Sequence, residues 1–278
     1  MKEWHRILNK VLTEGESRND RTGVGTLALF GEALEFDNSI TFPAITTKKL
    51  FWKPMAGELA GFLEGTQDNE RFKELGCNIW DGNGNADYWI HKAKFKGDLG
   101  RIYGVQWKDW TTVNTSDGVI KHLDQIKTLV DGIKKEPHSR RHLVTALNPG
   151  EFDQMCLPPC HVFFQVYVRG TDIIDLVVYM RSVDLGVGLP FDVASFALLQ
   201  RLIAQEVGMK SGKLKFFLGD AHIYKNHIDQ VKEILARPIW EGTTLHLDEG
   251  VGVFNFNPEH SKLVNYQCCD TIKMAMNV

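Results

Sequence analysis

The feature that most constrains the fold is a pair of apolar runs followed by a long segment that is apolar on every side. The runs "HVFFQVYV" and "IIDLVVYM" are separated by "RGTD", which is a hairpin signal between two strands. The segment "VASFALLQRLIAQEV", which follows Asp192, is typical of a helix that is buried all round. Such a helix needs a sheet and other helices to cover it, so we expect an α/β or α+β fold.

Other helices are indicated by the spacing of apolar residues. In residues 1–15, Trp4, Ile7 and further apolar side chains share one face, which predicts an amphipathic helix that ends near Gly15. Residues 51–65 have the pattern of a helix that carries Glu58. Residues 119–135 predict a second amphipathic helix, with Leu123, Ile126, Leu129, Val130 and Ile133 on one side.

Two remaining segments have different patterns. Residues 22–37 alternate weakly and have glycines at their ends, which favours a strand pair with a tight turn. The polar residues 82–97 are rich in glycine and asparagine and predict an irregular excursion. Since no repeat, low-complexity tract or linker is found, we expect one continuous domain over residues 1–278.

The composition argues against several classes of function. The net charge is −3, so the chain has no overall attraction to polyanions, and we expect no requirement for nucleic acid. No signal peptide or membrane-spanning run is recognisable, so no membrane association is expected. The five cysteines lack both metal-ligand spacing and a disulfide pattern. We therefore expect no metal site and a reducing, cytoplasmic location.

One cysteine lies where a reactive thiol could face a cleft. In "LPPCHVFFQ", Cys160 follows two prolines and directly precedes His161 and a predicted strand. The prolines fix the approach of the backbone, so the thiol is placed at the boundary of an element. A small buried cysteine without chemistry is the alternative, and Cys160 taken alone favours it.

Arginines in turn-like motifs supply a possible reason for a reactive thiol. They are Arg21 in "NDRTG", Arg140 and Arg141 in "HSRRH", and Arg181, which precedes Ser182, in "YMRSVD". Converging guanidinium groups can bind a phosphate and lower the pKa of a nearby cysteine. Spacing along the chain does not show convergence, so ordinary surface arginines remain the alternative.

An ordered set of motifs resembles the thymidylate synthase family from one end of the chain to the other. The motifs are "DRTGVGT", "FPAITTKK", "IWD", "GDLGRIYGVQW", "SRRH", "LPPCH", "RSVDLGVGLPF", "GDAHIYKNHIDQ" and the closing "IKMAMNV". The resemblance implies a thymidylate synthase-like α/β fold with a mixed sheet covered by helices, and a homodimer whose sheets pack back to back. It also implies transfer of a one-carbon unit from 5,10-methylenetetrahydrofolate to C5 of a pyrimidine nucleoside monophosphate.

The resemblance assigns roles around the pyrimidine ring. Cys160 is expected to be the nucleophile that adds to C6. Glu58 is expected to organise water and move protons at the base. Tyr103 and His161 are expected to line the reacting ring, with Gln165 in support. This reaction suits a thiolate, because C5 is a poor nucleophile until addition at C6 gives an enolate.

Further positions are assigned to the phosphate, the sugar and the folate. The resemblance implies that phosphate is held by Arg21, Arg181 and Ser182, with Arg140 and Arg141 reaching in from the partner subunit. It assigns His222 and Tyr224 to the sugar hydroxyl, and Trp80, Asp184 and the C-terminal Val278 to the folate.

Asp192 departs from the family and bears on the choice of base. The family has an asparagine there, whose amide gives a hydrogen bond to O4 of uracil and accepts one from N3. An ionised Asp192 only accepts, so it would repel O4, whereas cytosine offers an amino group at N4 and, when protonated, a donor at N3. We therefore expect a deoxycytidylate substrate, as in the deoxycytidylate hydroxymethylases of viruses that modify their DNA, and host cytoplasm as the location if the chain is viral. A thymidylate synthase that tolerates Asp192 is the alternative.

Three other departures concern the product. Asn83, Gly186 and Leu147 stand where the family usually has bulky aromatic residues. Smaller side chains make room for water, and water on the C5 methylene gives hydroxymethyl, whereas hydride gives methyl. We expect deoxycytidylate hydroxymethylation, with reductive methylation as the alternative, because His161 and the "IKMAMNV" tail are as in the reductive enzymes.

Two functions from other protein classes remain as alternatives. A cysteine hydrolase would use Cys160 with a histidine and an acid, but it leaves the arginines unexplained. A non-catalytic nucleotide-binding or RNA-binding relative would keep the arginines without needing Cys160 or Glu58.

Overall fold

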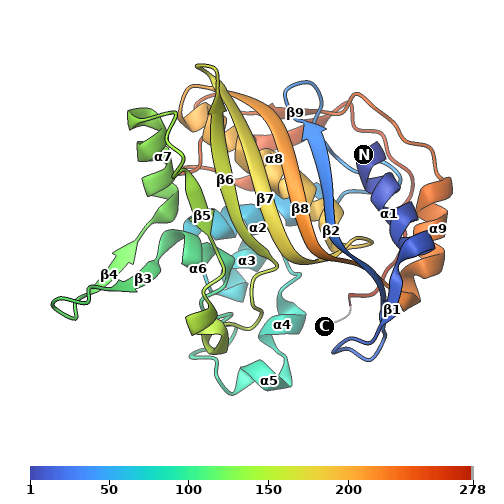
Figure 1. Ribbon diagram of the computed structural model, residues 1–278, viewed down its shortest axis with the longest axis horizontal. Helices are drawn as coiled ribbons and strands as arrows, with labels where there is room; N and C mark the ends of the chain where they lie inside the picture. The colour runs from blue at the N-terminus through green and yellow to red at the C-terminus, as the bar shows by residue number, and fades with distance from the viewer. Residues whose placement is uncertain (277–278) are drawn as a thin grey trace.

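A mixed six-stranded sheet forms the centre of the molecule in a computed structural model, which describes residues 1–276 (Figure 1). The strand order is β1-β2-β8-β7-β6-β5, and only β7 and β8 run parallel. The strands are β1 Glu16–Arg18, β2 Thr26–Asp37, β5 Leu143–Thr145, β6 His161–Arg169, β7 Ile173–Asp184 and β8 Lys210–Tyr224. Two small antiparallel pairs lie outside it, formed by β3 Trp110–Val113 with β4 Ile120–Leu123, and by β9 Thr244–Leu247 with β10 Ser261–Val264. The expected mixed sheet with covering helices is confirmed.

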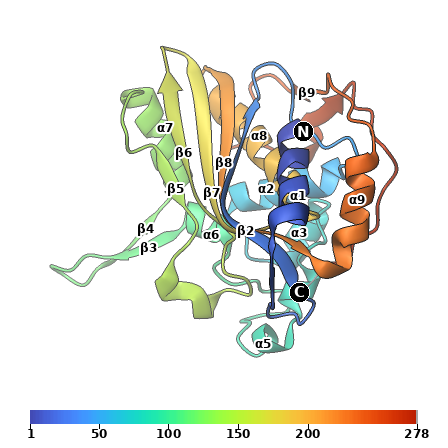
Figure 2. The ribbon, with the colours of Figure 1, turned by 45° about the vertical axis from the view of Figure 1, so that its right-hand side comes forward.

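The predicted hairpin and buried helix are also confirmed. Strands β6 and β7 pair antiparallel across the "RGTD" break, and β7 leads directly into α8, Gly188–Glu206. Helix α8 lies on one face of the sheet, where α2, Trp52–Glu64, covers its other side (Figure 2). Because protein surrounds it, α8 buries apolar residues around its whole circumference. The turn between β7 and α8 therefore lies at the edge of the core.

The remaining helices are shorter or lie nearer the surface. The predicted N-terminal helix is α1, which ends at Gly15 as expected, and α2 carries Glu58 and ends at Gly65 in the left-handed conformation, with φ of 75°. Helix α1 spans Lys2–Glu14. The other helices are α3 Asn69–Glu74, α4 Asp81–Gly84, α5 Asp87–Ile90, α6 Tyr103–Lys108, α7 Gln125–Lys135 and α9 Ile228–Ala236. Short helices α4 and α5 lie within the predicted irregular excursion. Within residues 1–276, no helix is long and apolar enough to cross a membrane.

Two local predictions were wrong. Residues 26–37 form the single strand β2 rather than a strand pair, because Gly31 takes a φ of 87° without interrupting the pairing register with β8. The strand continues past Gly31 and stays paired with β8. The second amphipathic helix begins only at Gln125, since Asp124 caps it by accepting a hydrogen bond from the backbone of Lys127, and the residues before Asp124 form β4.

The face of the sheet opposite α8 carries a row of aromatic side chains. The registers place Phe163, Tyr179 and Phe217 side by side on β6, β7 and β8, and the rings of Phe163 and Tyr179 are stacked at 5.9 Å. Phe217 is 42% exposed and Tyr167, further along β6, is 65% exposed. This aromatic face is thus apolar surface that the single chain leaves open.

Candidate active site

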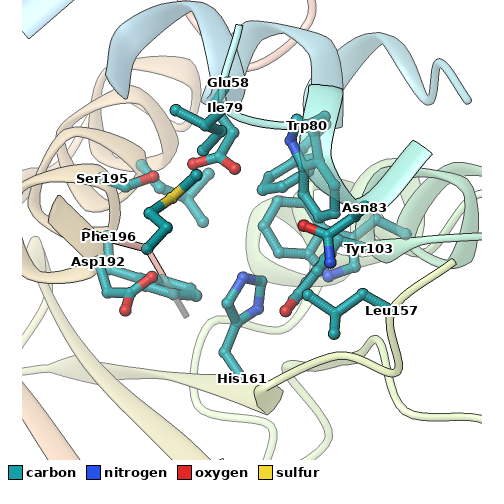
Figure 3. Close-up of a pocket in the computed structure, with 14 residues that line it drawn as sticks. Glu58, Ile79, Trp80, Asn83, Tyr103, Leu157, His161, Asp192, Ser195 and Phe196 are labelled. Atoms are coloured by element: carbon teal, nitrogen blue, oxygen red, sulfur yellow. The ribbon is translucent and has the colours of Figure 1, made fainter. Parts of the chain in front are cut away.

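A cavity of about 190 Å³ opens between α2, α8 and the start of β6 (Figure 3). Glu58 and Asp192 face it from α2 and α8, and His161 faces it from β6. The wall is completed mainly by aromatic and apolar side chains, which are Phe62, Ile79, Trp80, Tyr103, Trp107, Leu157, Phe196, Leu199 and Met276, together with Asn83 and Ser195. The structure thus brings together Glu58, Tyr103, His161 and Asp192, the ring-facing residues expected from the sequence.

Cys160 directly precedes His161 of the cavity wall but is not itself among the residues that line the cavity, and it is held by its backbone. Its N–H donates to the Tyr103 hydroxyl at 2.8 Å, and its carbonyl accepts from the N–H of Arg181 at 2.9 Å. The Arg181 guanidinium donates from Nε to the carbonyl of Pro159 at 2.8 Å and from Nη2 to that of Pro158 at 2.7 Å. The two prolines, Tyr103 and Arg181 therefore fix the half-buried thiol in position.

Burial and the charge of Arg181 act in opposite directions on the Cys160 thiol. Burial raises the pKa of the thiol, while the positive charge of Arg181 and the hydroxyl of Tyr103 lower it and Asp192 raises it further. Burial has the largest effect, so the net shift within a single chain is upward. Within the single chain Arg181 is the arginine that lowers the pKa of the thiol, and convergence of the other arginines on the site stays a prediction.

The two carboxylic acids that face the cavity are both shifted toward their neutral forms. Burial raises the pKa of Glu58 to about 7, and the Trp80 indole, whose N–H has no fully formed hydrogen bond, partly offsets the rise. Burial also raises the pKa of Asp192 well above its usual range, and the nearby charges of Glu58 and Asp184 raise it further. The neutral form of Asp192 is therefore favoured in the free protein, whereas the expectation of cytosine refers to the ionised form.

His161 is a neutral part of the cavity wall. Its ring lies 4.1 Å from that of Tyr103 and 5.0 Å from that of Phe196, measured between centroids. Burial lowers the pKa of His161 to about 3, so the ring carries no charge at neutral pH. His161 can therefore donate or accept a hydrogen bond but cannot supply positive charge.

The sugar-binding residues expected from the sequence, His222 and Tyr224, lie together at the end of β8. His222 Nδ1 bonds Asp220 Oδ1 at 2.9 Å, and the rings of His222 and Tyr224 meet edge to face at 5.1 Å. Burial raises the pKa of Tyr224, with the charges of Asp184 and Asp20 adding to the rise and that of Arg21 lowering it. The expected phosphate and sugar groups thus approach one another around Tyr224.

The loop that carries Arg21 is held by Asp20. The Asp20 carboxylate accepts from the backbone of Gly25 at 2.7 Å and from the hydroxyl of Thr22 at 2.6 Å. Arg21 itself is exposed. Ser182 is half-buried and lies beside Asp220 in the register of β7 and β8. An exposed guanidinium on a fixed loop is suited to meet an anion from solvent.

Arg140, Arg141 and Gln165 lie away from the cavity of this chain, and none of them is among its lining residues. Arg140 and Arg141 are exposed in the turn between α7 and β5, and within residues 1–276 neither makes an ion pair. Gln165 lies on the aromatic face of β6, opposite the inward-facing Phe164 and Val166. The position expected to cover the folate, Val278, lies outside the described residues.

A second cavity of about 460 Å³ adjoins the first and shares Glu58, Ile79, Asp192 and Met276 with it. Its wall is otherwise mostly apolar, with Lys48 and Lys49 at one side. Asp184 lies at its edge, where its Oδ1 accepts from the backbone of Gly186 at 2.8 Å and of Val187 at 3.1 Å. An apolar slot with cationic groups beside a nucleotide cavity fits a flat, acidic co-substrate such as a reduced folate.

Sequence reasoning missed two residues of this region. Lys48 lies within the motif "FPAITTKK" but was given no role, although its buried ammonium donates to the carbonyl of Gly186 at 2.7 Å. Met276 lines both cavities, and no periodic pattern at the end of the chain could have indicated this. Within the described residues, no group of three or more potential ligands for a metal ion occurs.

The three small residues that were expected to open the cleft behave differently. Asn83 lines the first cavity as expected. Leu147 lies outside the lining of both cavities, so it does not widen them. At Gly186 the space of a side chain is already occupied, since a Cβ there would lie 2.7 Å from Cε of Met274. The expectation that Gly186 leaves room for water was therefore wrong.

Comparison with known proteins identifies the relatives of this arrangement. The family model described as thymidylate synthase matches residues 2–278. The chain belongs to the thymidylate synthase family. It is similar to a thymidylate synthase of Corynebacterium aurimucosum, with 40% identity over 272 residues, which cover 98% of this chain and 96% of that protein. Membership makes it a folate-dependent transferase that moves a one-carbon unit to C5 of a pyrimidine nucleotide, with methylenetetrahydrofolate as co-substrate.

Proposed function

We propose that the protein acts on deoxycytidylate and converts it to 5-hydroxymethyldeoxycytidylate. The observation that carries the proposal is Asp192, a carboxylic acid that faces the reaction cavity from α8. The resemblance of the motif "GLPFDVA" to the family implies that the family has an asparagine where this chain has Asp192. The choice of base therefore depends on what an acid can do that an amide cannot.

A neutral Asp192 offers one donor and one acceptor, as an amide does. Either cytosine or uracil can meet that pair, so repulsion of O4 is not what separates them. Cytosine N3 is basic and can take the acid proton, which gives a carboxylate facing a protonated ring. Uracil N3 already carries a hydrogen and cannot take the proton of the acid. Because charge-assisted hydrogen bonds are roughly twice as strong as neutral ones, cytosine gains more from Asp192.

The remaining residues support addition of the thiol to a ring activated in this way. A protonated N3 withdraws electrons from C6, where the Cys160 thiolate adds. The Tyr103 hydroxyl and Arg181 both favour the thiolate, and bound phosphate would be met by Arg21 and Ser182 at the other end of the substrate. Glu58, with a pKa of about 7, can give or take the C5 proton at neutral pH.

The assignment of hydroxymethyl as the product depends on Asn83. Its amide replaces an aromatic wall at the cavity and can hold an ordered water near the reacting carbon. Water added to the C5 methylene gives hydroxymethyl, and hydride from the folate gives methyl instead. Met276 covers the cavity from the C-terminal segment and favours the methyl product, so reductive methylation is the second candidate for deoxycytidylate.

Ordinary thymidylate synthesis from deoxyuridylate is favoured by one observation. The relative from Corynebacterium aurimucosum, 40% identical, is named thymidylate synthase. A neutral Asp192 would also allow uracil to bind. The two substrates therefore have to be separated by assay.

We also propose a homodimer in which Arg140 and Arg141 complete the phosphate site of the partner. The aromatic face offers a second copy an apolar surface, with Phe217 at 42% and Leu143 at 43% exposure. Arg140 and Arg141 lie in the turn that leads into β5, the edge strand of the same sheet. A partner packed on this face would have its own site close to these arginines.

The test is a competition assay with deoxycytidylate and deoxyuridylate in the presence of methylenetetrahydrofolate. We expect deoxycytidylate to be preferred, a product heavier by one hydroxymethyl group, and no rise in dihydrofolate absorbance. Asp192→Asn should shift the ratio of kcat/KM values toward deoxyuridylate by roughly ten- to a hundredfold. Asp229→Asn, the same change at an exposed position of α9, is the control. Preference of the unmodified enzyme for deoxyuridylate would overturn the substrate assignment, and dihydrofolate formed in step with the product would overturn hydroxymethylation.

A further inference from the structure

The turn between β7 and α8 has a socket that the C-terminal segment fills. A Cβ placed on Gly186 would lie 2.7 Å from Cε of Met274, so the flexible end of Met274 would have to move to make room for it. The backbone of Gly186 is fixed by its hydrogen bond to Asp184, 2.8 Å long. The missing side chain at 186 is therefore replaced in space by the side chain of Met274, which reaches it from the other end of the sequence.

A buried lysine joins the same two segments. Lys48 Nζ donates to the Gly186 carbonyl at 2.7 Å and lies 3.9 Å from Sδ of Met274. Burial lowers the pKa of Lys48 to about 8, and the charge of Asp184 opposes this shift. The socket thus has a polar rim that contacts the thioether as well as an apolar space that accepts its methyl group.

Docking of Met274 determines where Met276 lies. Only Ala275 separates the two residues, and both side chains line the second cavity. Met276 lines both cavities and shares that boundary with Glu58 and Asp192. It therefore stands where the nucleotide cavity meets the second cavity.

We propose that Gly186 and Met274 are a matched pair that docks the C-terminal segment before substrates bind, and that Met276 is thereby positioned to close the site. The second half rests on the family reaction at this site, whereas the docking does not depend on which nucleotide is the substrate. In this view Gly186 is a positioning residue rather than an opening for water. A bulky residue there should expel Met274 and release the segment.

The first experiment uses carboxypeptidase digestion of the full chain, without nucleotide or folate, followed by intact mass. In the unmodified protein, trimming should slow sharply on reaching Met274. In Gly186→Phe, release of Met274 should be about tenfold faster, because the docked state no longer protects it. Gly186→Ala is the graded control and should change the rate little, since the methyl end of Met274 can swing aside. Equal trimming of the unmodified protein and Gly186→Phe would overturn the proposal.

The second experiment uses kinetics and a compensating variant. Gly186→Phe should raise KM for methylenetetrahydrofolate about tenfold while KM for the nucleotide changes little. Gly186→Phe combined with Met274→Ala should recover most of that loss, because the ring then occupies the space that Met274 left. If the double variant is no better than Gly186→Phe alone, the pair is not matched and the proposal fails. The kinetics are run with whichever pyrimidine nucleotide turns over, so failure of the deoxycytidylate assignment is seen separately.

Discussion

The candidate site has two sides that are built in different ways, and on the thiol side Tyr103 is the residue that lines the cavity. The thiol wall, formed by Cys160, Tyr103 and Arg181, is tied to the backbone by hydrogen bonds of 2.7 to 2.9 Å. The acid wall, formed by Glu58 and Asp192, faces the cavity with carboxyl groups whose pKa values are raised by burial. The thiol wall is fixed before the substrate binds, whereas the neutral acids of the acid wall can donate protons to a bound ligand.

This difference separates rate from selectivity. A preorganised wall contributes to the chemical step, so changes there should lower the rate for every substrate alike. A wall of unpaired acids gains most from a ligand that can accept a proton, so changes there should alter which base is used and how the protein responds to pH. Variants of the thiol wall therefore test the effect on rate, and variants of the acid wall test the effect on selectivity and pH response.

The largest effect is expected from removing the nucleophile of the thiol wall. Cys160→Ser should lower kcat by about 10³-fold or more for any pyrimidine nucleotide, because the hydroxyl is a far weaker nucleophile than the thiolate. The Arg140→Ala, Arg141→Ala double variant should also be nearly inactive, since Arg181 is largely engaged with the carbonyls of Pro158 and Pro159.

Mixing these two inactive proteins tests whether the arginines act between subunits. After subunit exchange, about a quarter of the sites would combine an intact Cys160 with intact partner arginines, so activity should return. The measurement is turnover after equal amounts are refolded together, with each variant refolded alone as the control. Absence of any recovery, together with a monomer by ultracentrifugation, would place all phosphate contacts within one chain.

The sequence predicts the thiol wall better than the acid wall, for physical reasons. Cys160, Tyr103 and Arg181 lie in motifs whose backbone conformations are local, so their neighbours along the chain indicate their positions. The same is true of the hairpin and α8, where long apolar runs leave few alternatives. The protonation of Asp192 was not predictable, because it depends on enclosure by α2 and on charges distant in sequence.

The errors elsewhere have a similar origin. Glycines in residues 22–37 favour a turn, but pairing with β8 keeps residues 26–37 in one continuous strand. Leu123 falls at helical spacing from Ile126, yet the helix begins only after its N-cap, Asp124, so Leu123 lies outside it. The space at Gly186 was expected to admit water, but a residue at the far end of the chain fills it.

A smaller loss of rate is expected when the support of the thiol is removed. Tyr103→Phe leaves the backbone N–H of Cys160 without its partner and removes the hydroxyl that lowers the pKa of the thiol. We expect kcat/KM to fall roughly ten- to a hundredfold for deoxycytidylate and deoxyuridylate alike. The midpoint pH for alkylation of Cys160 by iodoacetamide should rise. An altered preference between the two nucleotides, with the alkylation profile unchanged, would show that Tyr103 belongs to recognition of the base instead.

The smallest effect concerns stability and belongs to the acid wall. Folding raises the pKa values of Glu58 and Asp192 above their unfolded values. At pH values between the unfolded and the folded pKa, the folded protein therefore binds more protons than the unfolded chain. The stability tied to these acids is fully present below the unfolded pKa, near 4, and is lost as pH rises through the folded pKa, which for Glu58 is about 7. Glu58→Gln and Asp192→Asn remove the group that must ionise inside the protein. Their melting temperatures should therefore exceed that of the unmodified protein by about 3–6 °C at pH 9 and by less at pH 5. Differential scanning fluorimetry measures the gap, with Glu249→Gln, an exposed carboxylate, as the control. A gap that stays constant with pH would mean that packing, and not the proton, distinguishes the amides, and the acid wall would then be as fixed as the thiol wall.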